Sequence, residues 1–194
     1  MIYTQDKTPE RIVNEIILHL VHIKPLNSNN YHSIYNFLQN NLHLSRTEDF
    51  LKEKLQEYPQ YFKGLYLDDE LIGVIQGFPR DDYILISEIA VDRRFRRKGY
   101  GTLLIKAFET EVQHKEIKVG AQDEAIQFYL SLGYKPSIYV QLKKDSWPPK
   151  NFIVKQEFED IVGYEIAVDK IDLDLLEDWK SKAISAQYLF TKSL

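Results

Sequence analysis

The residues best suited to chemistry lie where an apolar run, ending near Val91, passes through a basic turn into an amphipathic segment. A strand that leads directly into a helix points unpaired backbone N–H groups and the positive end of the helix dipole at one place. Glycine lets an anionic group come close to the backbone, and arginine and lysine add charge-assisted contacts. The turn holds Arg96, Arg97, Lys98, Gly99 and Gly101. The sequence therefore predicts a phosphate-binding turn between Val91 and Thr102.

Spacing separates the known kinds of phosphate-binding turn. A dinucleotide fingerprint needs a third glycine three residues after Gly101, where this chain has Leu104. A P-loop needs a Gly-Lys-Ser or Gly-Lys-Thr ending, which the turn lacks. A solvated basic turn or a nucleic-acid patch, to which Arg93 and Arg94 would add, is the remaining alternative. The position of the turn between a buried strand and a glycine-led helix favours the phosphate ligand.

Residue usage excludes several other kinds of chemistry. The 194 residues include no cysteine, which excludes disulfides, thiolate metal sites and any mechanism that passes a group through a protein thiol. The five histidines are scattered, and His19 and His22 lie three apart in an expected strand, where they face opposite sides. We therefore expect no metal site. The chain also lacks the Gly-x-Ser-x-Gly elbow of serine hydrolases.

The overall composition is that of a globular protein. Hydrophobic residues make up 44% and aromatic residues 13% of the chain, which is more than disordered chains carry. No apolar run is long enough for a membrane helix, and the first ten residues are polar. We expect a cytoplasmic protein with no membrane partner. A formal net charge of −4 argues against nucleic acid as a partner.

A second motif follows the basic turn, after one further expected strand. It runs Gln122-x-x-Ala125-x-x-Phe128-Tyr129 and ends in a Gly-Tyr pair at 133–134. The two motifs, in this order, resemble the pyrophosphate loop and the later Asn-x-x-Ala-x-x-Phe-Tyr helix of the GNAT superfamily of acyl-CoA-dependent N-acetyltransferases. Gln122 stands where that superfamily usually has Asn. The resemblance covers about residues 18 to 145.

The resemblance implies a mixed α/β fold with a central splayed sheet flanked by helices. It also implies acetyl-CoA as cosubstrate, with its pantetheine arm between the strand at 83–91 and the strand at 117–121. Backbone groups near Ile89 and Val91 would bind the arm and polarise the thioester carbonyl. The full cofactor-binding set is expected to be Ile89, Val91, Arg96, Arg97, Lys98, Gly99, Tyr100, Gly101, Thr102, Gln122 and Phe128.

Direct transfer to an amine needs a base and an acid. The attacking ammonium must lose a proton, and the departing thiolate is better expelled when it is protonated. The resemblance implies Tyr129 as the general acid, and a core aromatic residue is the alternative for this tyrosine. Glu88 is the candidate base, acting through water, because an ionisable group in an apolar strand is costly unless it is used or paired. A structural carboxylate paired with an arginine of the loop is the alternative for Glu88.

Hydrophobic periodicity and turn residues predict the elements that must position these groups. We expect helices capped by Ser28 and by a capping box at Ser45 to Glu48, and later a helix ended by Gly133. The predicted strands are 16–23, 61–67, 71–77, 83–91, 117–121 and 137–142, and the later helices are 99–114 and 123–132.

The chain is expected to divide into a GNAT-like domain, 1–145, and a C-terminal appendix, 146–194, after the Pro-Pro pair at 148–149. The appendix is predicted as a strand-like region at 152–168, a helix at 172–183 and a strand at 186–191. It would cover the acceptor site or form a homodimer contact.

These expectations point to an N-acetyltransferase that uses a ternary complex and acts on a primary amine of a small molecule or peptide. A catalytically silent acyl-CoA-binding or dimerisation module is the alternative. The identity of the acceptor does not follow from the residues.

Overall fold

The computed structural model describes residues 21–42, 46–146, 148, 152–157 and 159–194. It divides into two compact units. The first comprises the described residues up to Phe78 together with Glu88–Val112, and the second comprises Pro79–Ser87 and Gln113–Leu194. Strand β4 (Ile84–Val91) passes from the second unit into the first.

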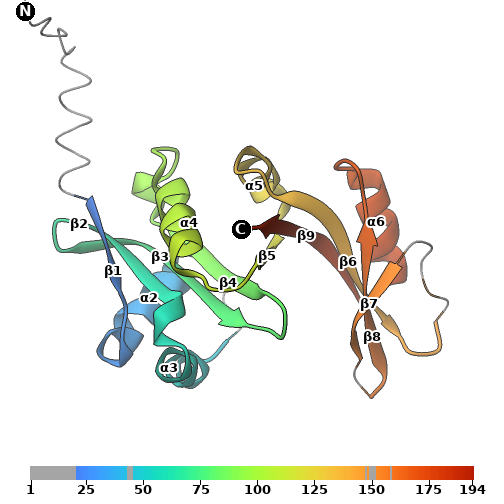
Figure 1. Ribbon diagram of the computed structural model, residues 1–194, viewed down its shortest axis with the longest axis horizontal. Coiled ribbons are helices and arrows are strands. Elements are labelled where there is room, and N and C mark those ends of the chain that lie inside the picture. The colour runs from blue at the N-terminus through green and yellow to red at the C-terminus, as the bar shows by residue number, and fades with distance from the viewer. Residues whose placement is uncertain (1–20, 43–45, 147, 149–151, 158) are drawn as a thin grey trace, which may run out of the picture. The chain divides into compact units, whose positions relative to one another are not determined.

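The first unit is an antiparallel sheet with helices (Figure 1). Its elements are β1 (Val21–Pro25), α2 (Tyr31–Asn41), α3 (Glu48–Glu57), β2 (Phe62–Leu67), β3 (Glu70–Pro79), the end of β4 and α4 (Tyr100–Glu111), with short 3-10 turns at Ser28–Asn30, Pro59–Tyr61 and Arg93–Phe95. The strand order is β1, β2, β3 and then β4. The strands predicted at 61–67 and 71–77 are β2 and β3, which form an antiparallel hairpin, and Asp68 takes a left-handed backbone (φ 52°) in its turn.

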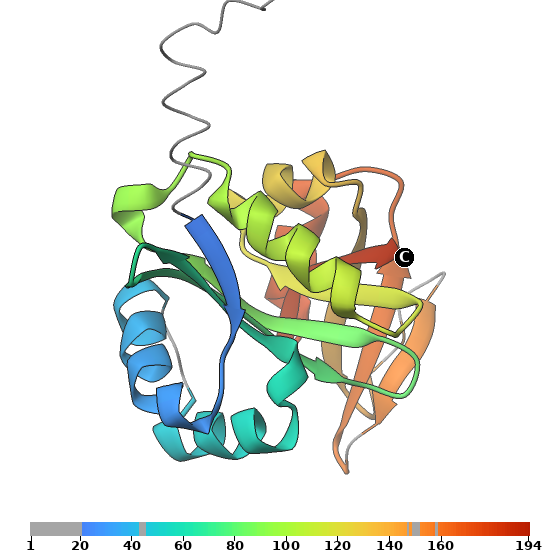
Figure 2. The same cartoon turned by 60° about the vertical axis from the view of Figure 1, so that its left-hand side comes forward.

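Helices cover both faces of this sheet (Figure 2). Helices α2 and α3 lie on the face that carries Val74 and Phe78, with which their buried leucines form the core. Helix α4 lies on the other face, close to Gly73, where an added Cβ would come 2.9 Å from Leu104. The two-sided cover fixes β4 and the start of α4 relative to the rest of this unit.

The two predicted helix caps are wrong by one or two residues. Asn27, not Ser28, accepts a hydrogen bond from the Asn29 N–H and begins the 3-10 turn before α2. Thr47 accepts from the Phe50 N–H at 3.3 Å and caps α3, so the helix begins two residues after the expected position. Ser45 lies outside the described residues. In each case several adjacent polar side chains could cap, and the backbone path selects one.

The second unit is a sheet built mostly from the C-terminal half of the chain. Its elements are the start of β4, β5 (Glu116–Ala121), α5 (Ile126–Ser131) after a 3-10 turn at Asp123–Ala125, β6 (Lys135–Lys143), β7 (Phe152–Glu157), β8 (Ile161–Ala167), α6 (Leu173–Lys182) and β9 (Ser185–Ser193). The strand order is β4, β5, β9, β6, β8, β7. The last strand therefore lies between β5 and β6 and pairs with both.

Residues after 145 are thus hydrogen-bonded into the same sheet as β5 and β6. The strand-like region predicted at 152–168 is two antiparallel strands, β7 and β8, instead of one. The boundary expected after residue 145 falls between β6 and β7, and β9 then returns to the middle of the sheet. A role for this segment as a dimer contact or acceptor cover stays a prediction.

One face of the second sheet is apolar and carries α5 and α6. Tyr188 and Phe190 of β9 are fully buried on this face. The Tyr188 hydroxyl accepts a hydrogen bond from the Asp172 N–H at 2.6 Å and donates to the Asp172 carbonyl at 2.8 Å, which anchors the start of α6. Phe190 stacks on Tyr129 of α5, with ring centroids 5.4 Å apart.

The other face of this sheet holds a buried polar network. Lys118 is 4% exposed, and its Nζ lies 2.9 Å from Oε2 of Glu165 and 5.2 Å from the centroid of the Tyr83 ring. Ser137 donates to Oε1 of the same carboxylate at 2.8 Å. Burial raises the pKa of Glu165, but hydrogen bonds from Lys118 and Ser137 outweigh it and hold the pKa below its usual value.

Replacing Lys118 with Met is expected to lower the free energy of unfolding by about 3 kcal/mol, because it leaves a largely buried carboxylate without its main partner.

The stabilisation by ionised Glu165 depends on pH. Since the pKa of Glu165 is lowered in the folded state, this stabilisation is complete at neutral pH and is lost as the pH falls below about 4.3. Urea unfolding of the wild type and of Glu165→Gln, at neutral and acidic pH, measures how much ionised Glu165 stabilises the fold. An equal difference between the two proteins at both pH values would contradict it.

The described residues contain no helix that combines the length and the hydropathy needed to cross a membrane. The same part of the chain has no cluster of three or more histidine, aspartate or glutamate side chains arranged to hold a metal ion.

Candidate functional site

The basic turn of the first unit has the local geometry of an anion-binding loop. After β4, Asp92 accepts a hydrogen bond from the Arg94 N–H at 2.9 Å and begins a 3-10 turn. Arg97 and Gly99 then take left-handed backbone conformations, with φ values of 64° and 84°. Helix α4 begins at the next residue. Successive N–H groups in a turn can form a concave anion-binding site, called a nest.

The backbone donors of this turn are available to a ligand. No backbone N–H from Arg96 to Thr102 makes a hydrogen bond of standard geometry to another described residue, and the first intrahelical bond runs from the Leu103 N–H to the Gly99 carbonyl at 3.1 Å. The Gly99 position is exposed, and an added Cβ there would meet nothing within 4 Å. A row of free donors at a helix N-terminus fits a diphosphate.

The arginine side chains of the turn have different roles. Arg96 donates from Nε to the Val91 carbonyl at 2.9 Å and from Nη2 to the Asn41 carbonyl at 3.2 Å. Its guanidinium therefore joins the turn to the ends of β4 and α2, while the residue stays exposed. Arg94 is paired with Asp92 and Glu70, and its hydrogen bonds lower the pKa of Asp92. Arg97 and Lys98 are exposed.

The remaining cofactor-binding residues expected in the first unit lie beside this turn. Tyr100, Gly101 and Thr102 form the first turn of α4, and the Tyr100 side chain is 7% exposed, so only its backbone N–H is offered to a ligand. Ile89 and Val91 are half-buried in β4. The parallel register of β4 with β5 covers only Ile84–Ile86 and ends before these residues.

Glu88 is paired with an arginine, but not with one from the loop. Nη1 of Arg46, in the segment between α2 and α3, lies 3.2 Å from Oε1 of Glu88, and Gln76 of β3 donates a hydrogen bond to Oε2. The Glu88 side chain is only 10% exposed. Glu88 is therefore paired, with an arginine other than the expected one, and its use as a base stays a prediction.

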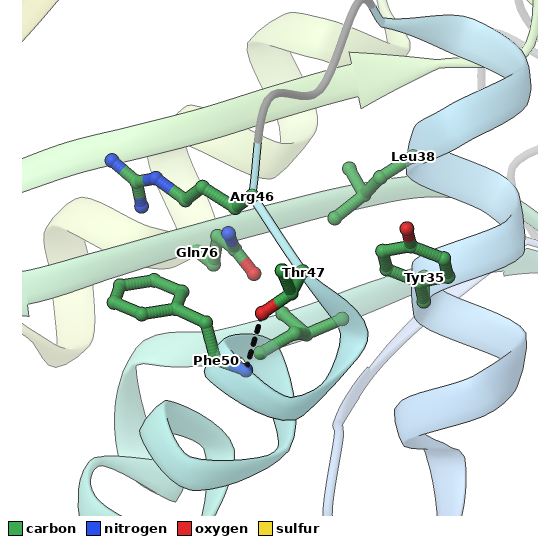
Figure 3. A pocket seen from close by; sticks show the side chains of 7 residues that line it. Tyr35, Leu38, Arg46, Thr47, Phe50 and Gln76 are labelled. Carbon is green, nitrogen blue, oxygen red and sulfur yellow. Dashed lines mark hydrogen bonds between the residues drawn. The ribbon is translucent and has the colours of Figure 1, made fainter.

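A small pocket adjoins this cluster (Figure 3). It is lined by Tyr35, Leu38, Arg46, Thr47, Phe50, Leu51 and Gln76. The guanidinium of Arg46 and the ring of Phe50 lie on one side of it in the view of Figure 3, and Tyr35 and Leu38 lie on the other. Its volume of about 10 Å³ is room for about one water molecule.

The second unit contains Gln122, Phe128 and Tyr129. Tyr129 is 3% exposed and packs against the rings of Phe128, Tyr134 and Phe190 at 5.2, 5.7 and 5.4 Å. Burial raises the pKa of its phenol, which therefore stays protonated at neutral pH. Gln122 precedes the 3-10 turn and is exposed.

Three residues of these surroundings were not foreseen. Arg46 and Gln76 converge on Glu88 from distant segments, and no sequence pattern links them to it. Phe190 stacks on Tyr129 from the last strand. The alternation of Tyr188 and Phe190 in that strand was the available signal that both side chains face the same helices.

Solved structures share this fold. Ard1 from Thermoplasma volcanium is 21% identical, with a TM-score of 0.56, and the match covers 77% of this chain and 99% of that one. The Escherichia coli ribosomal-protein-S18-alanine N-acetyltransferase is 16% identical (TM-score 0.55; 78% and 96% covered). Diaminobutyrate acetyltransferase EctA from Paenibacillus lautus is 11% identical (TM-score 0.54; 78% and 98% covered).

A comparison with curated proteins finds no match. The model of the acetyltransferase (GNAT) family matches residues 30–134, which are more than half of the 194 residues. That range includes the turn at 92–102, Glu88 and Tyr129. The predicted resemblance and mixed α/β fold are confirmed, and the chain belongs to the acetyltransferase (GNAT) family of acyltransferases.

Proposed function

We propose that this acetyltransferase moves the acetyl group of acetyl-CoA to a primary amine by direct attack in a ternary complex. The observation that carries the proposal is the row of unpartnered N–H groups from Arg96 to Thr102 at the start of α4. Arg97 and Lys98 add exposed positive charge beside it. This donor set fits the diphosphate of coenzyme A, and bound acetyl-CoA would supply an activated acetyl thioester.

Each residue has one proposed task. A backbone N–H near Ile89 or Val91 polarises the thioester carbonyl, as pre-aimed donors do in other enzymes. Glu88, through water, takes the proton that the ammonium must lose. Tyr129 gives its phenolic proton to the departing sulfur, and its raised pKa keeps that proton in place until it is needed. Gln122 and Phe128 are proposed to contact the cofactor.

Two observations support direct transfer to an amine. The chain has no cysteine, so it has no thiol that could carry the acetyl group between two half-reactions. The structural neighbours include enzymes named for an alanine of ribosomal protein S18 and for diaminobutyrate, and the second was solved with L-2,4-diaminobutyric acid and coenzyme A. Their acceptors are amines, on a protein and on a small molecule respectively.

The test is a calorimetric titration with acetyl-CoA, followed by a screen for release of free CoA over a panel of amines. We expect saturable binding, CoA release with some acceptors, and intersecting initial-rate patterns when both substrates are varied. Binding without release for every acceptor would contradict acetyl transfer. Parallel initial-rate lines would contradict the ternary complex but not acetyl transfer itself.

A further inference from the structure

An ion pair in the first unit joins the segment before α3 to strand β4. It links Arg46 to Glu88, whose side chains are 36% and 10% exposed. The guanidinium of Arg46 also lies over the rings of Phe50 and Phe78, 5.1 and 5.6 Å from their centroids. Cation–π attraction to two rings holds this charge at the edge of the pocket.

Stability alone does not account for this pair. Desolvation of the buried carboxylate of Glu88 offsets much of the attraction, so the pair adds little over an apolar pair of similar size. In addition, the buried Nη1 of Arg46 makes no hydrogen bond of standard geometry to any described residue, although it lies 3.2 Å from the carboxylate. Arg46, whose side chain lines the pocket, therefore carries a buried donor that the protein itself does not use fully.

We infer that Arg46 and Glu88 together select an acceptor that carries a carboxylate beside its amine, as a free α-amino acid does. The inference rests on the proposed acetyl transfer to an amine. The ammonium of such an acceptor would pair with Glu88 and its carboxylate with Arg46. The ion pair between Arg46 and Glu88 is thereby replaced by two ion pairs with the acceptor, so both side chains keep a partner of opposite charge.

An acceptor that carries only one charge cannot pair with both Arg46 and Glu88. A simple amine that pairs with Glu88 competes with Arg46 and leaves the guanidinium, held between two rings, without a partner. The amino terminus of a peptide has the same defect, because its carboxylate lies at the far end of the chain. The pocket has room for about one water molecule, so an acceptor that pairs with both side chains must displace the Arg46–Glu88 contact and widen the pocket.

The test compares matched acceptors on the full chain at saturating acetyl-CoA. Each set contains an α-amino acid, its carboxamide and its decarboxylated amine, and tripeptides with the same first residue complete the panel. We expect kcat/KM for the acid to exceed that of the carboxamide by about tenfold or more, because a site built for a polar group discriminates strongly against its absence. A carboxamide or tripeptide that reacts as well as the acid overturns the inference.

Variants of Arg46 locate this preference. Arg46→Met is expected to bring the acid-to-carboxamide ratio close to one, and Arg46→Lys to keep part of the preference. Lys52→Met is the matched control, because Lys52 is an exposed cation of α3, 5.0 Å from the Tyr31 ring and outside the pocket. Its ratio should equal that of the wild type.

The outcomes separate the two proposals. If no amine is acetylated, the proposed function fails and the inference fails with it. If amines are acetylated without preference for the acid, or if Arg46→Met keeps the preference, only the inference fails. Should Arg46→Met not fold, as a thermal melt would show, the wild-type ratio and Arg46→Lys still decide the result.

Discussion

Replacement of Tyr129 by Phe is expected to lower kcat by on the order of 100-fold, which is typical for loss of a general acid, and to leave the Kd for acetyl-CoA unchanged. The ring keeps its contacts with Phe128, Tyr134 and Phe190, so only the phenolic proton is lost. Steady-state rates of CoA release and calorimetry measure the two quantities separately. The raised pKa of Tyr129 adds a second expectation: wild-type kcat shows no decline on the alkaline side below about pH 10.

Tyr164→Phe is the matched control for this variant. Tyr164 is also a buried tyrosine of the second unit, 6% exposed, but it packs against Phe152 of the outer strand β7. Its loss should leave kcat unchanged. Equal rates for wild type and Tyr129→Phe would make Tyr129 a core aromatic residue, whereas a raised Kd in that variant would indicate a structural effect on the cofactor site.

Reversal of charge at Arg97 is expected to raise the Kd for acetyl-CoA by at least about tenfold, since a like charge placed against a ligand costs several kcal/mol before screening. Arg97 is exposed and lies within the row of free N–H groups, so Arg97→Glu would place a carboxylate beside the bound diphosphate. The loss should shrink as salt is added. Acetyl-pantetheine, which has no diphosphate, should react equally well with the wild type and with Arg97→Glu.

Two further variants separate charge from backbone geometry. Lys106→Glu makes the same charge change at an exposed position of α4 that lies after its first turn, and should leave Kd unchanged. Arg97→Gly removes the charge while relieving a left-handed backbone, so it should hold or raise the melting temperature and still weaken binding. Unchanged affinity in both Arg97 variants would exclude this side chain from the diphosphate site.

Local patterns predicted the turn-forming residues well where one residue type satisfies a backbone demand. Gly133 has a φ of 82°, as expected for a glycine that ends a helix, and Gly99 is also left-handed, with a φ of 84°. The hairpin between β2 and β3 turns at Asp68, an aspartate that also takes a left-handed backbone. The helix caps were misplaced because Asn27 and Thr47 each have polar neighbours that could cap equally well.

Non-local pairing was not predictable in the same way. Arg46 and Glu88 are 42 positions apart, and Lys118 and Glu165 are 47 apart, so periodicity within a single element carries no information about either pair. The placement of β9 between β5 and β6 depends on which sheet edge the last strand can reach, and this in turn brings Phe190 onto Tyr129.

By itself the sequence determined the family and the local chemistry of the basic turn, because glycine spacing and a strand-to-helix junction set backbone donors within a few residues of each other. Only the tertiary structure decided that Arg96 donates to the carbonyls of Val91 and Asn41, and that Arg46 pairs with Glu88. The reason is physical: a long cationic side chain has several partners within reach, and burial and ring contacts from remote segments select among them.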